Sequence, residues 1–502
     1  MSENEKYDDL DKSIGRLKRA AIDAYVRDKI GGGAESFTRN KDGYEMVFSG
    51  LFTGTTMGID RPGPDGEGGG TGFKASTSNS GPNYGGGSGS PSELDYTEEF
   101  NSVRRKIEDI VEPWRKLPNP ETIDRVLSGC RGAVSHLSIS LGSEGKGVAG
   151  GILETKLNSV HEQLAHMSGN TVNAFRSNVI ESLQHVIGGL SAASTYWTAA
   201  LAYEHGIFKK ARESVVDIIE KGIESFESVA KKSATEGRFS IILEIGKLAK
   251  EGFSLIPGGA AASAIVSKLE LGLSTLKGLA NEKTVSQTSG SYDDALASLT
   301  KAFTQLNETI TTAEKAVEKN LIDNMGEMRK RKSSYDLKLA AAKSSDVSTS
   351  ERLNIDQSRV VDILTRSKPK IIDELNSAWH EIQSVHMTTC VSRPGKIGIG
   401  INGPSSKFHD MKWLIHDLIE ELTEETEYAF KDFEIAVELI EQGDSASKTK
   451  LEEMEQKIKD GSGLRPWQDR SIEKKMRDEE KQEQEKKKQD PGKNNQGNGK
   501  KK

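Results

Sequence analysis

The sequence predicts an all-α fold: an elongated antiparallel helical bundle with long helices, a disordered Gly-rich linker and a charged, disordered C-terminal tail. Apolar residues recur at every third or fourth position over long stretches, which is the spacing of one helix face. The 13 prolines among the 502 residues fall mostly at segment edges, which leaves room for long helices. Hydrophobic residues make up 34%, below the roughly 45–50% of ordinary globular chains. Thin helical layers are therefore favoured over a large compact core.

The composition changes along the chain and divides it into five segments. Leu10, Ile14 and Leu17 share one face of a first helix. The Gly-rich stretches that follow, such as RPGPDGEGGGTG, cannot bury enough apolar surface to offset the entropy of ordering. The predicted segments are an N-terminal helix (residues 1–30), a disordered Gly/Ser/Pro-rich linker (31–90), an elongated helical-hairpin bundle (91–345), a C-terminal helical domain (350–460) and a disordered charged tail (461–502).

The strongest periodic signal predicts one very long helix in the middle of the chain. Apolar side chains step by threes and fours from residue 172 to residue 201, and the series resumes after Glu204. A period near 3.5 residues over so many turns indicates a helix packed along its length against partners. Its seam consists of Val179, Leu183, Val186, Leu190, Trp197 and Leu201.

A second long helix, from Tyr292 to Tyr335, is predicted to run antiparallel to the first. The chain between the two helices turns apolar and small, and residues 253–272 are read as a Gly/Ala hairpin with a turn at Pro257. A strand is expected only in GKIGIGINGPSS, residues 395–406, where isoleucine alternates with glycine.

No catalytic or metal-binding motif emerges from the sequence. It contains no Gly-rich phosphate loop after a strand, no G-x-S-x-G and no H-E-x-x-H. His409 and His416 lie seven residues apart, which is not the i,i+4 spacing that presents two ligands on one helix face. Acid pairs such as Glu420-Glu421 and Glu424-Glu425 are read as a solvated helix face. We therefore expect no enzyme activity, no cofactor and no metal.

Net charge and hydropathy limit the partners that the protein can bind and the route by which it can leave the cell. The net charge of −7 does not favour nucleic acid as a partner. No run of 18 apolar residues exists, so no membrane-spanning helix is expected. The first residues are polar and contain no signal-peptide segment. The protein is expected either to stay in the cytoplasm or to leave by a route that does not read such a segment.

One stretch has the pattern of a helical hairpin. Met167-Ser168-Gly169 separates two helical segments, and the second begins with apolar residues and Phe175, then continues through GGLSAAS and LAYEHGIFKKARESVVDIIE. Residues 92–235 thereby resemble the helical-hairpin proteins exported by type VII secretion systems of actinobacteria, including the W-x-G superfamily. Met167 stands where that superfamily has its tryptophan.

The resemblance implies a Y-x-x-x-D export signal on a helix. Two pairs in this chain have that spacing: Tyr428 with Asp432, and Tyr7 with Asp11. Four-residue spacing places both side chains on adjacent turns of one helix face, where a receptor could read them together. The first pair is preferred because it falls within the C-terminal helical region.

Three functions are open at this point. The first is a non-enzymatic bacterial protein exported by, or associated with, a type VII secretion system. It would act through helix–helix packing and oligomerisation, with a small helical partner, the secretion-machinery ATPase or further copies of itself as partners, and serve as a virulence or competition factor. The alternative is a membrane-active, pore-forming helical toxin of the colicin type that uses the apolar hairpin near 253–272 to contact the membrane. The third is a coiled-coil scaffold.

Overall fold

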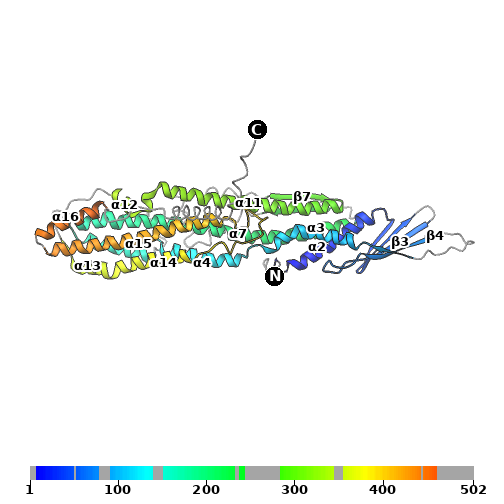
Figure 1. Ribbon diagram of the computed structural model, residues 1–502, viewed down its shortest axis with the longest axis horizontal. Coiled ribbons are helices and arrows are strands. Elements are labelled where there is room, and N and C mark those ends of the chain that lie inside the picture. Colours follow the sequence, from blue (N-terminus) through cyan, green and yellow to red (C-terminus); the bar gives the residue numbers. More distant parts are fainter. Residues whose placement is uncertain are drawn as a thin grey trace, which may run out of the picture.

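Long helices lying side by side give the molecule the shape of a rod, with a β-sheet at one end (Figure 1). The computed structural model describes residues 7–49, 53–78, 91–139, 151–231, 237–243, 283–343, 354–442 and 445–460. The Gly/Ser-rich residues 81–90, the predicted apolar hairpin 253–272 and the predicted tail 461–502 lie outside the described residues. Among the helices of the described ranges, none combines the length and the hydropathy that spanning a bilayer requires.

The helix α7 (Ser182–Lys231) is the central helix of the rod. Its 50 residues extend about 75 Å at 1.5 Å per residue. It packs against α2, α4, α11 and α15, which is why its apolar side chains are buried over its whole length. The remaining helices and helical turns are α2 (Leu10–Tyr25), η1 (Val26–Ile30), α3 (Thr97–Val111), η2 (Glu112–Lys116), α4 (Pro120–His136), α5 (Ile152–Ala165), α6 (Asn170–Ala174), η3 (Phe175–Glu181), α11 (Tyr292–Lys330), η5 (Lys332–Ser334), α12 (Leu337–Lys343), α13 (Gln357–Asp362), η6 (Ile363–Ser367), α14 (Lys368–Ser384), α15 (Ser405–Gln442) and α16 (Ser445–Asp460).

An N-terminal sheet overturns the all-α prediction. Five strands pair antiparallel in the order β1-β2-β3-β4-β5. Tyr44 and Met46 on β2 are buried while Glu45 between them is exposed, which is the alternation of a half-buried strand. The prediction of a pure helical bundle or coiled coil is therefore wrong. The prediction of a disordered linker is also wrong where these strands lie. The strands of this sheet are β1 (Ser36–Arg39), β2 (Gly43–Ser49), β3 (Thr53–Asp60), β4 (Thr71–Ser78) and β5 (Ser92–Asp95).

Asp23 on α2 joins the sheet to the helices. Its side chain is 2% exposed. The Tyr44 hydroxyl donates to one carboxylate oxygen at 2.6 Å. Arg39 donates to the other oxygen at 2.8 Å, and Nε of Arg61 donates to the first at 2.8 Å. Because these donors lie on or next to three strands, one buried and fully partnered carboxylate holds α2 against the sheet.

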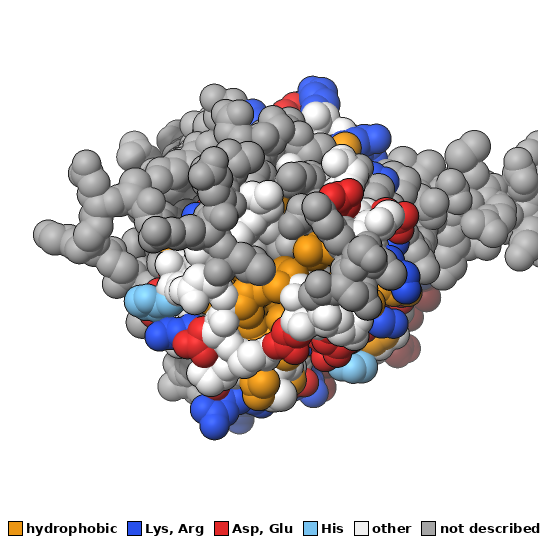
Figure 2. All heavy atoms as spheres, turned by 90° about the vertical axis from the view of Figure 1, so that its left-hand side faces the viewer, with side chains coloured by type: hydrophobic (Ala, Val, Ile, Leu, Met, Phe, Trp, Pro, Cys, Tyr) orange, Lys and Arg blue, Asp and Glu red, His pale blue; other side chains and the backbone are white. Residues whose placement is uncertain are grey.

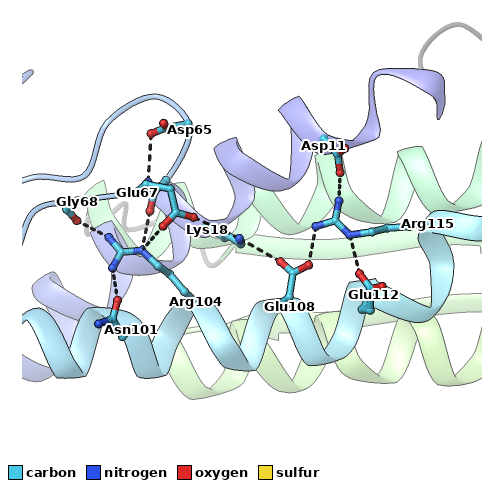
Figure 3. A network of polar contacts seen from close by, with 11 residues as sticks. Asp11, Lys18, Asp65, Glu67, Gly68, Asn101, Arg104, Glu108, Glu112 and Arg115 are labelled. Carbon is cyan, nitrogen blue, oxygen red and sulfur yellow. Dashed lines mark hydrogen bonds and ion pairs between the residues drawn. The ribbon is translucent and has the colours of Figure 1, made fainter.

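The connection between β3 and β4 lies against α2 and α3 and is held there by polar contacts (Figure 3). Nε of Arg104 on α3 donates to the carbonyl oxygen of Gly66 at 2.8 Å. Lys18 on α2 pairs with Glu67 of the connection at 3.4 Å and with Glu108 of α3 at 3.0 Å. These contacts tie one loop to two helices, so the end of the rod that carries the sheet is a packed structure.

A second, antiparallel strand pair connects the two longest helices. Strand β6 (Gly237–Leu243) follows α7, and strand β7 (Lys283–Ser289) precedes α11. Their register runs from Gly237 opposite Ser289 to Leu243 opposite Lys283. Figure 1 shows β7 running alongside α11, and β6 packs against α7 and α11.

The prediction of a strand at residues 395–406 is also wrong. Residues 395–404 form a series of turns, and Ser405 and Ser406 begin α15. Gly398, Gly400 and Gly403 have φ angles of +62°, +130° and +52°, which extended strands of L-residues do not adopt. The glycines that interrupt the isoleucines therefore occupy turns.

Candidate functional site

The segment between α14 and α15 lies near the middle of the rod (Figure 1). It folds around the side chain of Arg393. Nε of Arg393 donates to the carbonyl oxygen of Ile397 at 3.3 Å, and one terminal nitrogen donates to that of Val391 at 3.1 Å. The backbone N–H of Arg393 donates to the carbonyl oxygen of Ile401 at 3.0 Å. Residues 391–403, named the arginine loop below, are thus wound around one guanidinium group.

Two side chains of α11 hold the arginine loop. Glu314 forms an ion pair with Arg393, and its other oxygen accepts the backbone N–H of Ile399 at 2.8 Å. The side chains of this pair are both 0% exposed. Two turns earlier on α11, Asn307 accepts the backbone N–H of Gly398 at 2.8 Å and donates to the carbonyl oxygen of Lys396 at 2.9 Å. The loop is therefore fixed to one face of α11.

A second buried carboxyl group faces this ion pair from α7. Glu204 is 0% exposed, and neither of its carboxylate oxygens accepts a hydrogen bond from any described residue. Burial, and then the charge of Glu314, raise the pKa of Glu204 well above its ordinary value. Burial also raises the pKa of Glu314 to about 7, although Arg393 and the N–H of Ile399 act against this rise. When Glu204 carries a proton it can donate to Glu314, so two carboxyl groups and one guanidinium form a neutral cluster. We name Glu204, Glu314 and Arg393 the ionic centre.

The glycines of the arginine loop are required by its close approach to the ionic centre. A β-carbon at Gly398 would collide with the carboxylate of Glu314, and one at Gly403 would meet the guanidinium of Arg393 at 2.7 Å. Both glycines also have positive φ angles. The backbone of the loop thus lies directly on the ion pair, which a side chain at either position would prevent.

Two buried thiols lie next to the ionic centre. Cys390 precedes the arginine loop and donates from Sγ to the carbonyl oxygen of Met387 at 3.0 Å, and Cys130 lies on α4. Burial raises the pKa of Cys390 to about 12 and that of Cys130 well above its usual value. Both thiols are therefore neutral and unreactive in the folded chain. The ring of Phe208 covers the guanidinium of Arg393 at 4.9 Å. A cluster sealed in this way is suited to holding helices together rather than to acting on a substrate.

The two predicted export signals differ in accessibility. Tyr428 on α15 is 49% exposed, and Asp432 lies one turn further on the same helix, where burial raises its pKa. Tyr7 is buried: its hydroxyl donates to the carbonyl oxygen of Trp114 and accepts the N–H of Leu117 at 3.1 Å. Its partner Asp11 forms an ion pair with Arg115. Only the first pair therefore presents its tyrosine at the surface.

The predicted hairpin turn lies at the end of the rod opposite the sheet. Met167 is buried, Gly169 has φ +139°, and Ser168 pairs through its backbone with Asn354. Phe175 stacks on Phe433 of α15 with ring centroids 4.3 Å apart. Figure 2 views this end of the rod and shows hydrophobic side chains near its centre with acidic and basic side chains around them.

The six predicted seam residues are all buried, at 3% exposure or less. The first lies in η3 and the other five lie in α7: Val179, Leu183, Val186, Leu190, Trp197 and Leu201.

One group of side chains in the described part of the chain has the spacing of a cation site. The ligand atoms of His416, Asp417 and Glu420 lie within 4.8 Å of one another on α15. His416 also contacts Asp417 directly, at 3.2 Å, and its ring packs against Trp379 and Trp413. A pattern of paired histidines does not reveal this group, because it combines one histidine with a carboxylate four residues later.

The ionic centre was not predicted from the sequence. The one available signal was that Glu204 and Glu314 interrupt apolar helix faces, since Leu201 and Phe208 flank the first and Ile310 and Val317 flank the second.

Comparisons with known proteins do not assign a family. Neither the protein-family models, nor the curated proteins, nor the solved structures contain a significant match to this chain.

Proposed function

We propose that the chain is a non-enzymatic, membrane-active helical protein that inserts an apolar segment into a lipid bilayer. The observation that carries this proposal is the β6–β7 pair between the two longest helices, α7 and α11. Its two strands flank residues 244–282, which include an uncharged sequence rich in small residues. The rod supplies a rigid support, because α7 and α11 are buried against each other along their seams.

The sequence of this segment supports contact with lipid. The 16 residues 252–267 contain no charged side chain. A single helix needs about 20 such residues to span a bilayer, so the run is short for an unaided span. Lys250 and Lys268 flank it, and long lysine side chains can extend their ammonium groups to the headgroups while their stems lie in apolar surroundings. Insertion by several copies together would fit these properties.

A charge placed in the uncharged run is expected to prevent insertion. Ala262→Asp should reduce dye release from phosphatidylcholine/phosphatidylglycerol vesicles by about 100-fold, because an aspartate at bilayer depth costs roughly 2.5–3.5 kcal/mol. The matched control is Ala297→Asp, at an exposed position on α11, which should release dye like the unmodified protein. Equal release by the two variants, or no release by the unmodified protein at any pH between 5 and 9, would contradict the proposal.

We also propose, as a second candidate, export by a type VII secretion system. The observation that favours it is the exposed Tyr428 with Asp432 one turn later, on the rod that carries the α5–α7 hairpin. In this reading the tyrosine and the aspartate are read by the secretion machinery, and the hairpin packs against a small helical partner.

Truncation of the exposed tyrosine tests this second candidate. Tyr428→Ala should lower the amount of protein in the culture medium at least tenfold while the total amount in cells and medium stays constant. Glu427→Ala, at the neighbouring exposed position, serves as the control and should be exported normally. Export of the two variants at the same level would argue against Tyr428 as a signal.

A further inference from the structure

We propose that the ionic centre is a proton-dependent latch: the arginine loop stays closed on α7 and α11 while Glu204 and Glu314 together hold a proton, and it loosens when both are ionised. This inference concerns the rod alone and stands independently of any contact with lipid or with a secretion system.

The geometry makes Glu314 the group on which closure depends. It accepts from Arg393 and from the N–H of Ile399, so it supplies two of the contacts that hold the arginine loop on α11. Glu204 approaches it from α7, so the same carboxylate connects the loop to both long helices. With one proton on the two carboxyl groups the centre is neutral. With none, two negative charges share one guanidinium in a place without solvent, which costs free energy unless the groups move apart.

The charged and titratable groups around Glu204 come from each packed element. They are Glu314 from α11, and Arg393 and Cys390 from the segment that contains the arginine loop. Cys130 of α4 lies beyond Cys390, with Lys412 of α15 near it. Since burial keeps both thiols neutral, Arg393 is the cation that offsets the carboxylates at the centre.

The direction of the pH effect follows from the raised pKa values. Both acids bind protons more tightly in the folded chain than in the unfolded one. Their contribution to stability is therefore fully present at low pH, and it is lost as the pH rises through about 7 for Glu314 and further for Glu204. As the pH rises, the fraction of molecules in which both acids are ionised increases, so the latch should be looser at pH 8.5 than at pH 6.

The two buried thiols next to the latch provide a local readout. We suggest labelling the full-length protein with a maleimide at pH 6 and pH 8.5, then measuring the modified Cys130 and Cys390 by mass spectrometry. Each rate is divided by the rate of the urea-unfolded chain at the same pH, which removes the pH dependence of the thiol itself. The normalised rate at Cys390 should be at least tenfold higher at pH 8.5 than at pH 6, because local opening exposes it.

Variants separate the latch from a general effect of pH. Glu204→Gln keeps the size of the side chain without its charge, so its normalised rate at Cys390 should be the same at both pH values. Glu427→Gln changes an exposed acid of α15 and should behave as the unmodified protein. Glu425 of α15 is also buried, and burial raises its pKa to about 9. Its ionisation is therefore expected to lower the stability of the rod as the pH rises. For this reason the measurement has to report on the arginine loop alone.

Hydrogen exchange of the arginine loop gives a second measurement should Glu204→Gln fail to fold. In the unmodified protein, the amides of residues 391–403, corrected for intrinsic exchange, should lose protection at pH 8.5 by a larger factor than those of α3. A normalised labelling rate that does not change with pH would overturn the proposal, as would a Glu204→Gln variant as sensitive to pH as the unmodified protein, or an equal loss of protection in α3.

Discussion

Replacing Arg393 by methionine is expected to lower the free energy of unfolding by about 3–5 kcal/mol at pH 8, the range for removing one partner of a buried ion pair. Glu314, whose side chain is 0% exposed, would then have no cation beside it, so it would either remain charged without a partner or take up a proton, and both cost free energy at this pH. At pH 5 the loss should be smaller, because Glu204 and Glu314, whose pKa values are raised, are then protonated. Urea unfolding followed by circular dichroism at both pH values measures the difference.

Arg359→Met is the matched control for this substitution. Arg359 pairs with Asp356 at 3.1 Å, but the two side chains are 38% and 43% exposed, and such pairs contribute about 1 kcal/mol or less. Adding Glu314→Gln to Arg393→Met should recover part of the lost stability at pH 8, since it removes the acid that has lost its partner. If Arg393→Met were no more destabilising than Arg359→Met, Arg393 would not be the group that closes the arginine loop.

The second large effect is expected at Gly398. Gly398→Ala should lower the free energy of unfolding by about 2–4 kcal/mol. A side chain at its φ of +62° is strained by roughly 1–3 kcal/mol, and the added carbon would press on the carboxylate of Glu314. Thermal or urea unfolding at pH 7 measures the change.

Gly326→Ala provides a control with the opposite expected sign. Gly326 lies within α11, and a β-carbon there would meet no atom within 4 Å. Alanine is favoured over glycine inside a helix by up to about 1 kcal/mol, so this variant should be slightly more stable than the unmodified protein. A Gly398→Ala variant as stable as Gly326→Ala would mean that the loop backbone does not lie on the ion pair.

Helix periodicity is a local property, and it located the long helices of the rod. Leu183, Leu190 and Trp197 are spaced by seven residues, and all are buried in α7. What lies against them is not a local property. Trp197 stacks on Phe408 with ring centroids 4.8 Å apart and donates to its carbonyl oxygen at 3.2 Å, a contact between residues more than 200 positions apart that spacing alone could not indicate.

The sequence did not predict the N-terminal sheet, because the alternating pattern of its strands is short and lies within Gly-rich sequence. Alternation in β2 covers only the few residues around Tyr44 and Met46, and Gly-rich sequence on either side resembles a linker. Several glycines in this region serve packing instead. At Gly72, for example, a β-carbon would collide with the neighbouring strand β3 at Gly58. Composition records how many glycines there are but not which of them lie against another backbone.

The ionic centre could be anticipated only in part. Glu204 stands out because it breaks an apolar face, and a buried acid is expected to have a partner. Its partners come from α11 and from the arginine loop, which are far away in the sequence, and the glycines of that loop suggested a strand. The residues that carry the proposed latch therefore become recognisable only once the helices are placed beside one another.

The position of Arg393 late in the chain has a consequence for biosynthesis. A ribosome that has released residues up to Cys390 has already delivered both acidic members of the ionic centre but not the cation that compensates them. Until the arginine loop emerges, the nascent α7 and α11 cannot close against each other at that point without leaving carboxylates uncompensated. Truncated chains that stop before this loop should therefore express poorly, and an amino-terminal half of the rod is not expected to fold on its own.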